Sequence, residues 1–159
     1  MRFRNPERGP PMPSLTNREI VDRFARALAA NDVNEQHALL ADDFVETHPQ
    51  SGERIVGKSN RRAIIENYPG RPEDWRGQTD RVVGGEDRWV MTPTFSALRI
   101  VGTGDDYTIA GHITYPGGDD SHLIQLIELR NAKISTLTTY FAPKFDAPAW
   151  RSTWVEKTP

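Results

Sequence analysis

The sequence predicts an α+β fold in which helices come first and pack on one face of an antiparallel sheet that follows them. Three observations support this class. Apolar residues recur at helical spacing between about residues 15 and 68, the period becomes that of strands beyond Gln78, and turn residues divide the second half of the chain. A chain of 159 residues is long enough for one such domain.

The first helix is predicted to begin after Thr16, which has capping-box spacing to Glu19, and to end near Asn31. An apolar stripe at helical spacing is expected to face the core. It consists of Ile20, Val21, Phe24 and Leu28.

Two more helices are expected before the sheet. Asp32 and Glu35 repeat the capping pattern and open a short helix that buries Val33, Leu39 and Leu40. A third helix is predicted from about Ser59 to Tyr68, where Pro69 stops it. Its inward side chains are expected to be Ala63, Ile64 and Tyr68.

Four or five strands are predicted beyond Gln78, separated by glycine pairs and by Asn131-Ala132. Their approximate spans are Gln78–Val83, Arg88–Val101, Tyr107–Tyr115, Ser121–Arg130 and Lys133–Phe141.

The last hairpin predicts a register. A two-residue turn at Asn131-Ala132 places Arg130 opposite Lys133, and residues 126 and 137 then pair. Both sheet faces come out largely apolar, so we expect helices on one and a second subunit on the other, which makes the protein a homodimer. One predicted face carries His122, Ile124, Leu126, Glu128, Leu137, Thr139 and Phe141.

The chain divides into a proline-rich leader at residues 1–14, expected to be disordered, a domain at 15–142 and a tail at 143–159. Trp150 and Trp154 suggest that the tail packs on the body or on a partner subunit. A net charge of −2 gives no field for nucleic acid or a membrane, and the absence of cysteine excludes thiol chemistry. A cytoplasmic protein without a cofactor or metal is expected.

Several motifs, in this order, resemble the NTF2-like superfamily in its SnoaL-like (polyketide cyclase-like) branch, over roughly residues 15–141. They are the helix–Asn31-Asp32–helix unit, the segment from Leu40 to Phe44, His48-Pro49, Gly57 before a helix, and the final strand from Ile134 to Phe141. The resemblance implies a cone, in which a curved antiparallel sheet wraps around three N-terminal helices and encloses a cavity. Members include cyclases, isomerases, epoxide hydrolases, dehydratases and proteins without catalysis.

The resemblance also implies roles for single residues. The ketosteroid isomerases carry a carboxylate base at the position of His48, an oxyanion-hole tyrosine at that of Phe24, and a protonated aspartate near Ile124. A base is therefore retained while both oxyanion donors are missing, which argues against steroid isomerase activity. Among the predicted strands only Gln78–Val83 contains an aspartate, Asp80, which argues against the two-aspartate site of the epoxide hydrolases.

His48 is the candidate catalytic residue, because an imidazole exchanges protons near neutral pH. The alternative is a loop histidine that bonds a backbone carbonyl. His122 or His112 could line the cavity or lie at the surface, and His37 is expected at the surface. Together with His48, the predicted pocket contains Phe24, Tyr68, His122, Ile124, Leu126, Leu137 and Phe141.

Two functions remain open. The first is a proton-transfer enzyme of the cyclase, isomerase or dehydratase kind, in which His48 acts on a hydrophobic carbonyl substrate without a cofactor. The second is a non-catalytic module that binds a small apolar molecule, or a dimerising interaction domain joined through its Trp150/Trp154 tail.

Overall fold

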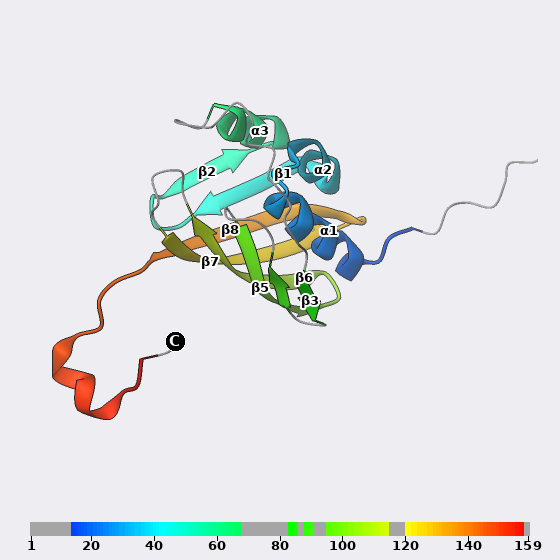
Figure 1. Cartoon of the computed structure of the whole chain (residues 1–159). Coiled ribbons are helices and arrows are strands. Elements are labelled where there is room, and N and C mark those ends of the chain that lie inside the picture. The colour runs from blue at the N-terminus through cyan, green and yellow to red at the C-terminus, as the bar shows by residue number, and fades with distance from the viewer. Residues whose placement is uncertain (1–13, 68–82, 86–87, 91–94, 115–119, 158–159) are drawn as a thin grey trace, which may run out of the picture.

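The protein folds as an α+β domain in which three helices cover one face of a curved six-stranded sheet that does not close (Figure 1). The computed structural model describes residues 14–67, 83–85, 88–90, 95–114 and 120–157. The elements are α1 (Asn17–Ala29), α2 (Val33–Leu39), β1 (Leu40–His48), β2 (Glu53–Val56), α3 (Lys58–Glu66), β3 (Val83–Gly85), β4 (Arg88–Val90), β5 (Phe95–Thr103), β6 (Asp106–Thr114), β7 (Asp120–Arg130), β8 (Lys133–Pro143) and a 3-10 helix (Ala149–Trp154). Residues 1–13 of the leader and the predicted pocket residue Tyr68 lie outside the described residues.

The large sheet has the strand order β2-β1-β8-β7-β6-β5, and β3 pairs with β4 in a separate ribbon. All neighbours in the large sheet are antiparallel except β1 and β8, which run parallel. The predicted antiparallel sheet is confirmed apart from this one parallel pair, but β1 and β2 come before Gln78, where no strand was predicted. Strands β1 and β2 were missed because the inward positions of β1 include Glu46 and His48, which hide the alternation of apolar and polar residues.

The first two helices begin as predicted. Thr16 caps α1 in a capping box with Glu19, and the Asp32 side chain accepts a hydrogen bond from the Glu35 amide at the start of α2. Asn31, with φ of 50°, turns the chain between them.

The third helix departs from the prediction. It begins at Lys58, after Gly57 with φ of 86°, and its buried residue is Arg61. Ala63 and Ile64 are exposed instead of facing inward. The helix turns a charged side chain to the core because Glu46 of β1 lies there to pair with it.

The core lies between α1 and the inner face of the sheet. Aliphatic and aromatic side chains of α1, β1 and β5 to β8 lose nearly all contact with water there. The largest fully buried side chains are Phe24, Phe44, Ile20, Leu40, Ile100, Ile109, Ile127, Ile134, Leu137 and Val21.

The last hairpin has the predicted turn and a different register. Asn131 and Ala132 both have positive φ, as a two-residue hairpin turn requires, and Arg130 pairs with Lys133. An irregularity between Glu128 and Leu129 then shifts the pairing by one residue, with Ser135 as the extra residue in β8. Pairs such as Leu126 with Thr138 replace the predicted ones.

The shift changes which residues share a face. His122, Ile124 and Leu126 lie on the outer face and are exposed, whereas Leu137 and Phe141 lie on the inner face. The predicted grouping of these five residues on one face is wrong, because a single extra residue in a strand of period two exchanges the faces beyond it.

Candidate functional site

A chain of hydrogen bonds connects polar side chains from α2, α3, β1 and β8 beneath α1. We call it the Glu46 network, and it consists of Gln36, Glu46, His48, Arg61 and Thr139. Sequence reasoning identified only His48 among its members.

Glu46 is the centre of this network. Its Oε1 accepts from Thr139 Oγ1 at 3.0 Å and lies 3.0 Å from His48 Nε2, and its Oε2 accepts from Arg61 Nε at 2.9 Å. The side chains of Glu46 and Arg61 are both more than nine-tenths buried. Both carboxylate oxygens are occupied, so Glu46 is placed to orient its neighbours.

Arg61 joins the network to the helices. Its Nη1 donates to Gln36 Oε1 at 2.9 Å, and Gln36 Nε2 donates to the carbonyl of Ala27 in α1. The guanidinium carbon lies 5.5 Å from the centre of the Phe24 ring, within reach of a cation–π interaction. One buried arginine thus contacts side chains from α1, α2 and β1, which fixes its position.

His48 lies at the end of β1, where the sheet face meets the surface. Nε2 points to Glu46, and Nδ1 lies 3.8 Å from Oε2 of the exposed Glu53, which is longer than a hydrogen bond. The side chain keeps about a fifth of its surface accessible. His48 is therefore a strand histidine bound to a carboxylate, and the alternative of a loop histidine bonded to a backbone carbonyl is wrong.

The ring of Phe141 packs against the imidazole of His48. Its ring stands edge-on to that of His48, with centroids 5.4 Å apart. Gln50 donates to the carbonyl of Phe141 and accepts from its amide at 2.8 Å, which ties the turn after β1 to the end of β8. These two hydrogen bonds fix the position of Phe141 beside His48.

Electrostatics couple the two titrating groups. The hydrogen bond to Glu46 raises the pKa of His48 above its ordinary value, although burial opposes this. Burial by itself would raise the pKa of Glu46, but the hydrogen bond from His48 and the charge of Arg61 outweigh it and hold that pKa below its usual value. The pair therefore favours an imidazolium beside a carboxylate.

The remaining predicted pocket residues separate into three groups. Phe24 and Leu137 have no accessible surface, so they are packed core residues and not the walls of an open cavity. His122, Ile124 and Leu126 lie on the outer face and cannot line a pocket beneath the helices. Phe141 remains beside His48, and Tyr68 lies outside the described residues.

The other two histidines that were weighed also lie away from His48. His112 pairs with His122 across β6 and β7, and their ring centroids are 5.4 Å apart. His37 lies in α2. Among the described residues, no three histidine, aspartate or glutamate side chains converge as metal ligands would.

The argument against a two-aspartate site needs correction. Asp42 and Asp43 lie in β1, Asp106 in β6 and Asp120 at the first position of β7, so aspartates do occur in strands, and the first three are exposed. The carboxylate that is buried in the described part of the chain is Glu46. In the sequence, the only sign of the role of Glu46 was its position two residues before His48.

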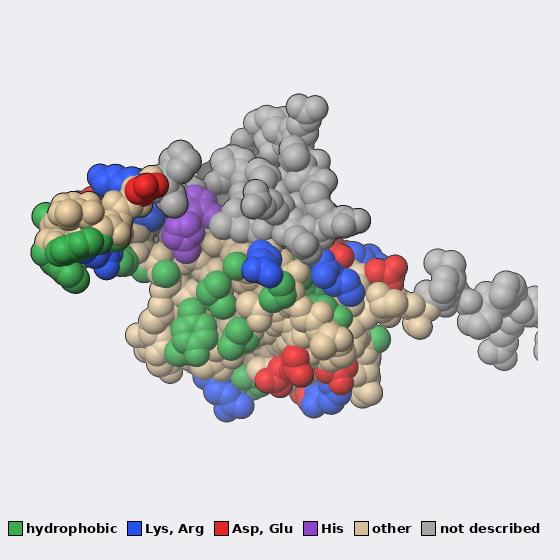
Figure 2. Space-filling model, turned by 90° about the horizontal axis from the view of Figure 1, so that it is seen from below, with side chains coloured by type: hydrophobic (Ala, Val, Ile, Leu, Met, Phe, Trp, Pro, Cys, Tyr) green, Lys and Arg blue, Asp and Glu red, His purple; other side chains and the backbone are tan. Residues whose placement is uncertain are grey.

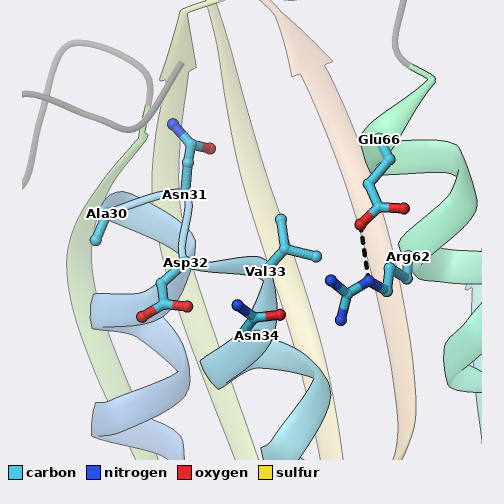
Figure 3. A pocket seen from close by; sticks show the side chains of 7 residues that line it. All are labelled: Ala30, Asn31, Asp32, Val33, Asn34, Arg62 and Glu66. Carbon is cyan, nitrogen blue, oxygen red and sulfur yellow. Dashed lines mark hydrogen bonds and ion pairs between the residues drawn. The ribbon is translucent and has the colours of Figure 1, made fainter. Parts of the chain in front are cut away.

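Two hollows of the described surface lie away from the Glu46 network. One of about 470 Å³ is formed by the turn between α1 and α2 and by the end of α3, where Arg62 pairs with Glu66 (Figure 3). Another of about 260 Å³ lies between the starts of α1 and β8. Neither is lined by a member of the Glu46 network. No described helix has the length and apolar character needed to cross a bilayer.

Comparison with known proteins identifies the family. The model of the SnoaL-like domain matches residues 21–136. No functionally curated protein matches the chain.

Solved structures agree with this fold. An NTF2-like protein of unknown function from Burkholderia xenovorans LB400 is 31% identical, with a TM-score of 0.68, covering 90% of this chain and 95% of its own. A protein described as a "putative ketosteroid isomerase" from Kribbella flavida DSM 17836 is 22% identical, with a TM-score of 0.69 and 90% of each chain covered. An LEH-like epoxide hydrolase from M. tuberculosis is 18% identical, with a TM-score of 0.54, covering 77% of this chain and 79% of its own. The protein therefore belongs to the SnoaL-like family of the NTF2-like superfamily.

Proposed function

We propose that this protein binds a small, largely apolar carbonyl compound beside His48 and Phe141 and exchanges a proton with it through His48. The reaction would be of the cyclase, isomerase or dehydratase kind and would need no cofactor. The observation that carries this proposal is the 3.0 Å contact between His48 Nε2 and the buried carboxylate of Glu46.

The contact assigns different tasks to the two ring nitrogens. Nε2 keeps its proton on Glu46, which leaves Nδ1 at the accessible rim to give a proton to a ligand or to take one from it. The carboxylate stabilises the imidazolium formed when the ring accepts a proton, as in other carboxylate–histidine pairs. Arg61 and Thr139 hold the carboxylate in place.

Names of solved relatives are compatible with proton transfer. One is described as an isomerase and another as an epoxide hydrolase, both at identities that support the fold alone. The choice of proton transfer therefore rests on the His48–Glu46 geometry.

Deuterium exchange tests the proposal without a known product. The full chain is incubated in D₂O with a panel of cyclic and aromatic ketones, and loss of the hydrogens next to the carbonyl is followed by proton NMR. His48→Gln should slow exchange of a responding ketone by roughly 10²- to 10⁴-fold, the usual contribution of a general acid or base. His122→Gln, on the outer face, is the matched control and should exchange like the unmodified chain. Equal rates in His48→Gln and the unmodified chain contradict the proposal.

A second function is favoured by the occupied state of Glu46. Both of its oxygens already accept hydrogen bonds, and the side chain of Phe24 offers no hydrogen bond to a developing oxyanion. A binding module would then recognise the same class of compound without turnover. Thermal-shift measurements with the ketone panel would show stabilisation, about 2.7 kcal/mol at a hundredfold excess over Kd, and mass spectrometry would show no conversion. Any conversion contradicts this second function.

A further inference from the structure

The tail that follows β8 carries large apolar side chains in contact with water. Phe145, Trp150 and Trp154 are 83%, 75% and 76% exposed, and Val155 is about half exposed. The tail runs away from the body before its 3-10 helix (Figure 1). The same chain therefore does not bury these rings, and exposed indoles in such numbers are typical of a surface that meets a partner.

The outer face of the sheet is a second uncovered apolar surface. We call its exposed residues Val101, Ile124, Leu126 and Tyr140 the outer patch. Register places Leu126 between Thr108 and Thr138, and Ile124 between Ala110 and Tyr140, so the centre of the patch carries no charge. Figure 2 shows hydrophobic side chains gathered on one face of the molecule, with the tail at its edge.

The tail directly follows β8, the strand that contributes Tyr140 to the outer patch. Pro143, the last residue of β8, pairs with Ser121 near the start of β7, next to the outward-facing His122, and the tail begins directly after it. In a dimer with a two-fold axis beside this end of β8, the tail of each copy would lie on the outer patch of the other. The two contacts are then identical, as two-fold symmetry requires.

The exposed area is sufficient for such a contact. A fully exposed aromatic side chain offers roughly 150–250 Å², so the three tail rings together expose on the order of 400–500 Å². The outer patch adds four side chains that are each about two-fifths exposed. The total approaches the roughly 800 Å² per partner of a standard stable interface. The uncharged centre of the patch also avoids repulsion between identical copies.

We propose that residues 144–157 of one copy lie on the outer patch of a second copy, reciprocally, with Trp150 and Trp154 as the main contacts. The proposal does not depend on the chemistry of His48. It differs from direct pairing of two sheets because the tail supplies the covering side chains.

Light scattering of the full chain is the first test. The unmodified chain should have twice the 18.0 kDa mass of one copy. The double variant Trp150→Glu/Trp154→Glu and the patch variant Leu126→Glu should each halve this mass. Ile64→Glu is the matched control, because Ile64 is also half exposed but lies on α3, and it should stay dimeric. A monomeric unmodified chain overturns the proposal, as does a tail variant that stays dimeric.

Cross-linking is the second test and does not require an interface to be broken. The chain contains no cysteine, so single cysteines can be introduced cleanly. A size-tagged Thr138→Cys chain mixed with a Ser152→Cys chain should give a product of mixed mass with a flexible bis-maleimide. Asn34→Cys, on α2, mixed with Ser152→Cys should give none. Absence of the mixed product from the first pair, or its equal formation in both pairs, overturns the proposal.

Discussion

The two faces of the sheet present histidines in opposite surroundings. On the inner face His48 is half-buried, bound to a carboxylate and packed against Phe141. On the outer face His122 is exposed and stands across from another histidine, beside aliphatic side chains that no described part of the chain covers. The difference shows that residue type alone does not define a functional histidine. A partner of opposite charge, held by further buried groups, distinguishes the first from the second.

The inner face also differs from the outer face in how its polar groups are satisfied. Each polar side chain of the Glu46 network bonds to another, which is what burial in a low-dielectric interior demands. The experiments below test this contrast, from the largest expected effect to the smallest.

Removing the buried arginine should have the largest effect. Arg61→Met leaves the buried charge of Glu46 without its partner, and we expect a loss of about 3–5 kcal/mol in the free energy of unfolding. The adjacent Arg62 is the matched control, because it pairs with Glu66 at the surface, and Arg62→Met should cost less than about 1 kcal/mol. Urea unfolding followed by circular dichroism measures both, and equal effects at the two arginines would contradict the contrast.

Two leucines compare the faces directly. Leu137→Ala should cost about 2–5 kcal/mol, because Leu137 has no accessible surface and its truncation leaves a cavity. Leu126→Ala, at 42% exposure, should cost less than about 1 kcal/mol in dilute solution. If urea unfolding gives the larger loss for Leu126→Ala, the assignment of the two faces is wrong.

Neighbouring threonines provide a finer comparison. Thr139→Val keeps the shape of the side chain but removes the hydroxyl that donates to Glu46, and we expect a loss of about 1.5–3 kcal/mol. Thr138→Val, on the outer face, should change the free energy of unfolding by no more than about 0.5 kcal/mol. Thermal unfolding of both variants measures the difference.

The pKa of His48 should respond to its carboxylate partner. NMR titration of the imidazole should give a value above the ordinary 6.5, and Glu46→Gln should lower it. Glu53→Gln should lower it less, since Glu53 is exposed and contributes the smaller effects. If Glu53→Gln lowers the pKa of His48 more than Glu46→Gln does, Glu46 is not the main partner of His48.

The same shift gives a pH dependence of stability. Because the pKa of folded His48 lies above its unfolded value, the stabilisation is fully present below about 6.5 and is lost as the pH rises through the folded pKa. Glu46 acts at the acid end, where its stabilisation is lost as the pH falls through its lowered folded pKa. Urea midpoints measured across these two ranges should show both losses, and Glu46→Gln should flatten them.

Local sequence determined much of this molecule. The caps at Thr16 and Asp32, the apolar stripe of α1 and the turn at Asn131-Ala132 are encoded by neighbouring residues, because each depends on hydrogen bonds or backbone conformations within a few positions. The order of these motifs was enough to predict the α+β class and the family.

Tertiary structure alone decided the register beyond Ser135 and the composition of the site. A bulge depends on the twist of a whole strand pair, so the spacing of apolar residues in β7 and β8 could not reveal it. One hydrogen bond of the Glu46 network joins Glu46 to Thr139, 93 positions away in sequence. Nothing near Arg61 in the sequence marks it as buried, because the reason for its burial is a carboxylate on another element that only the folded chain brings within 2.9 Å.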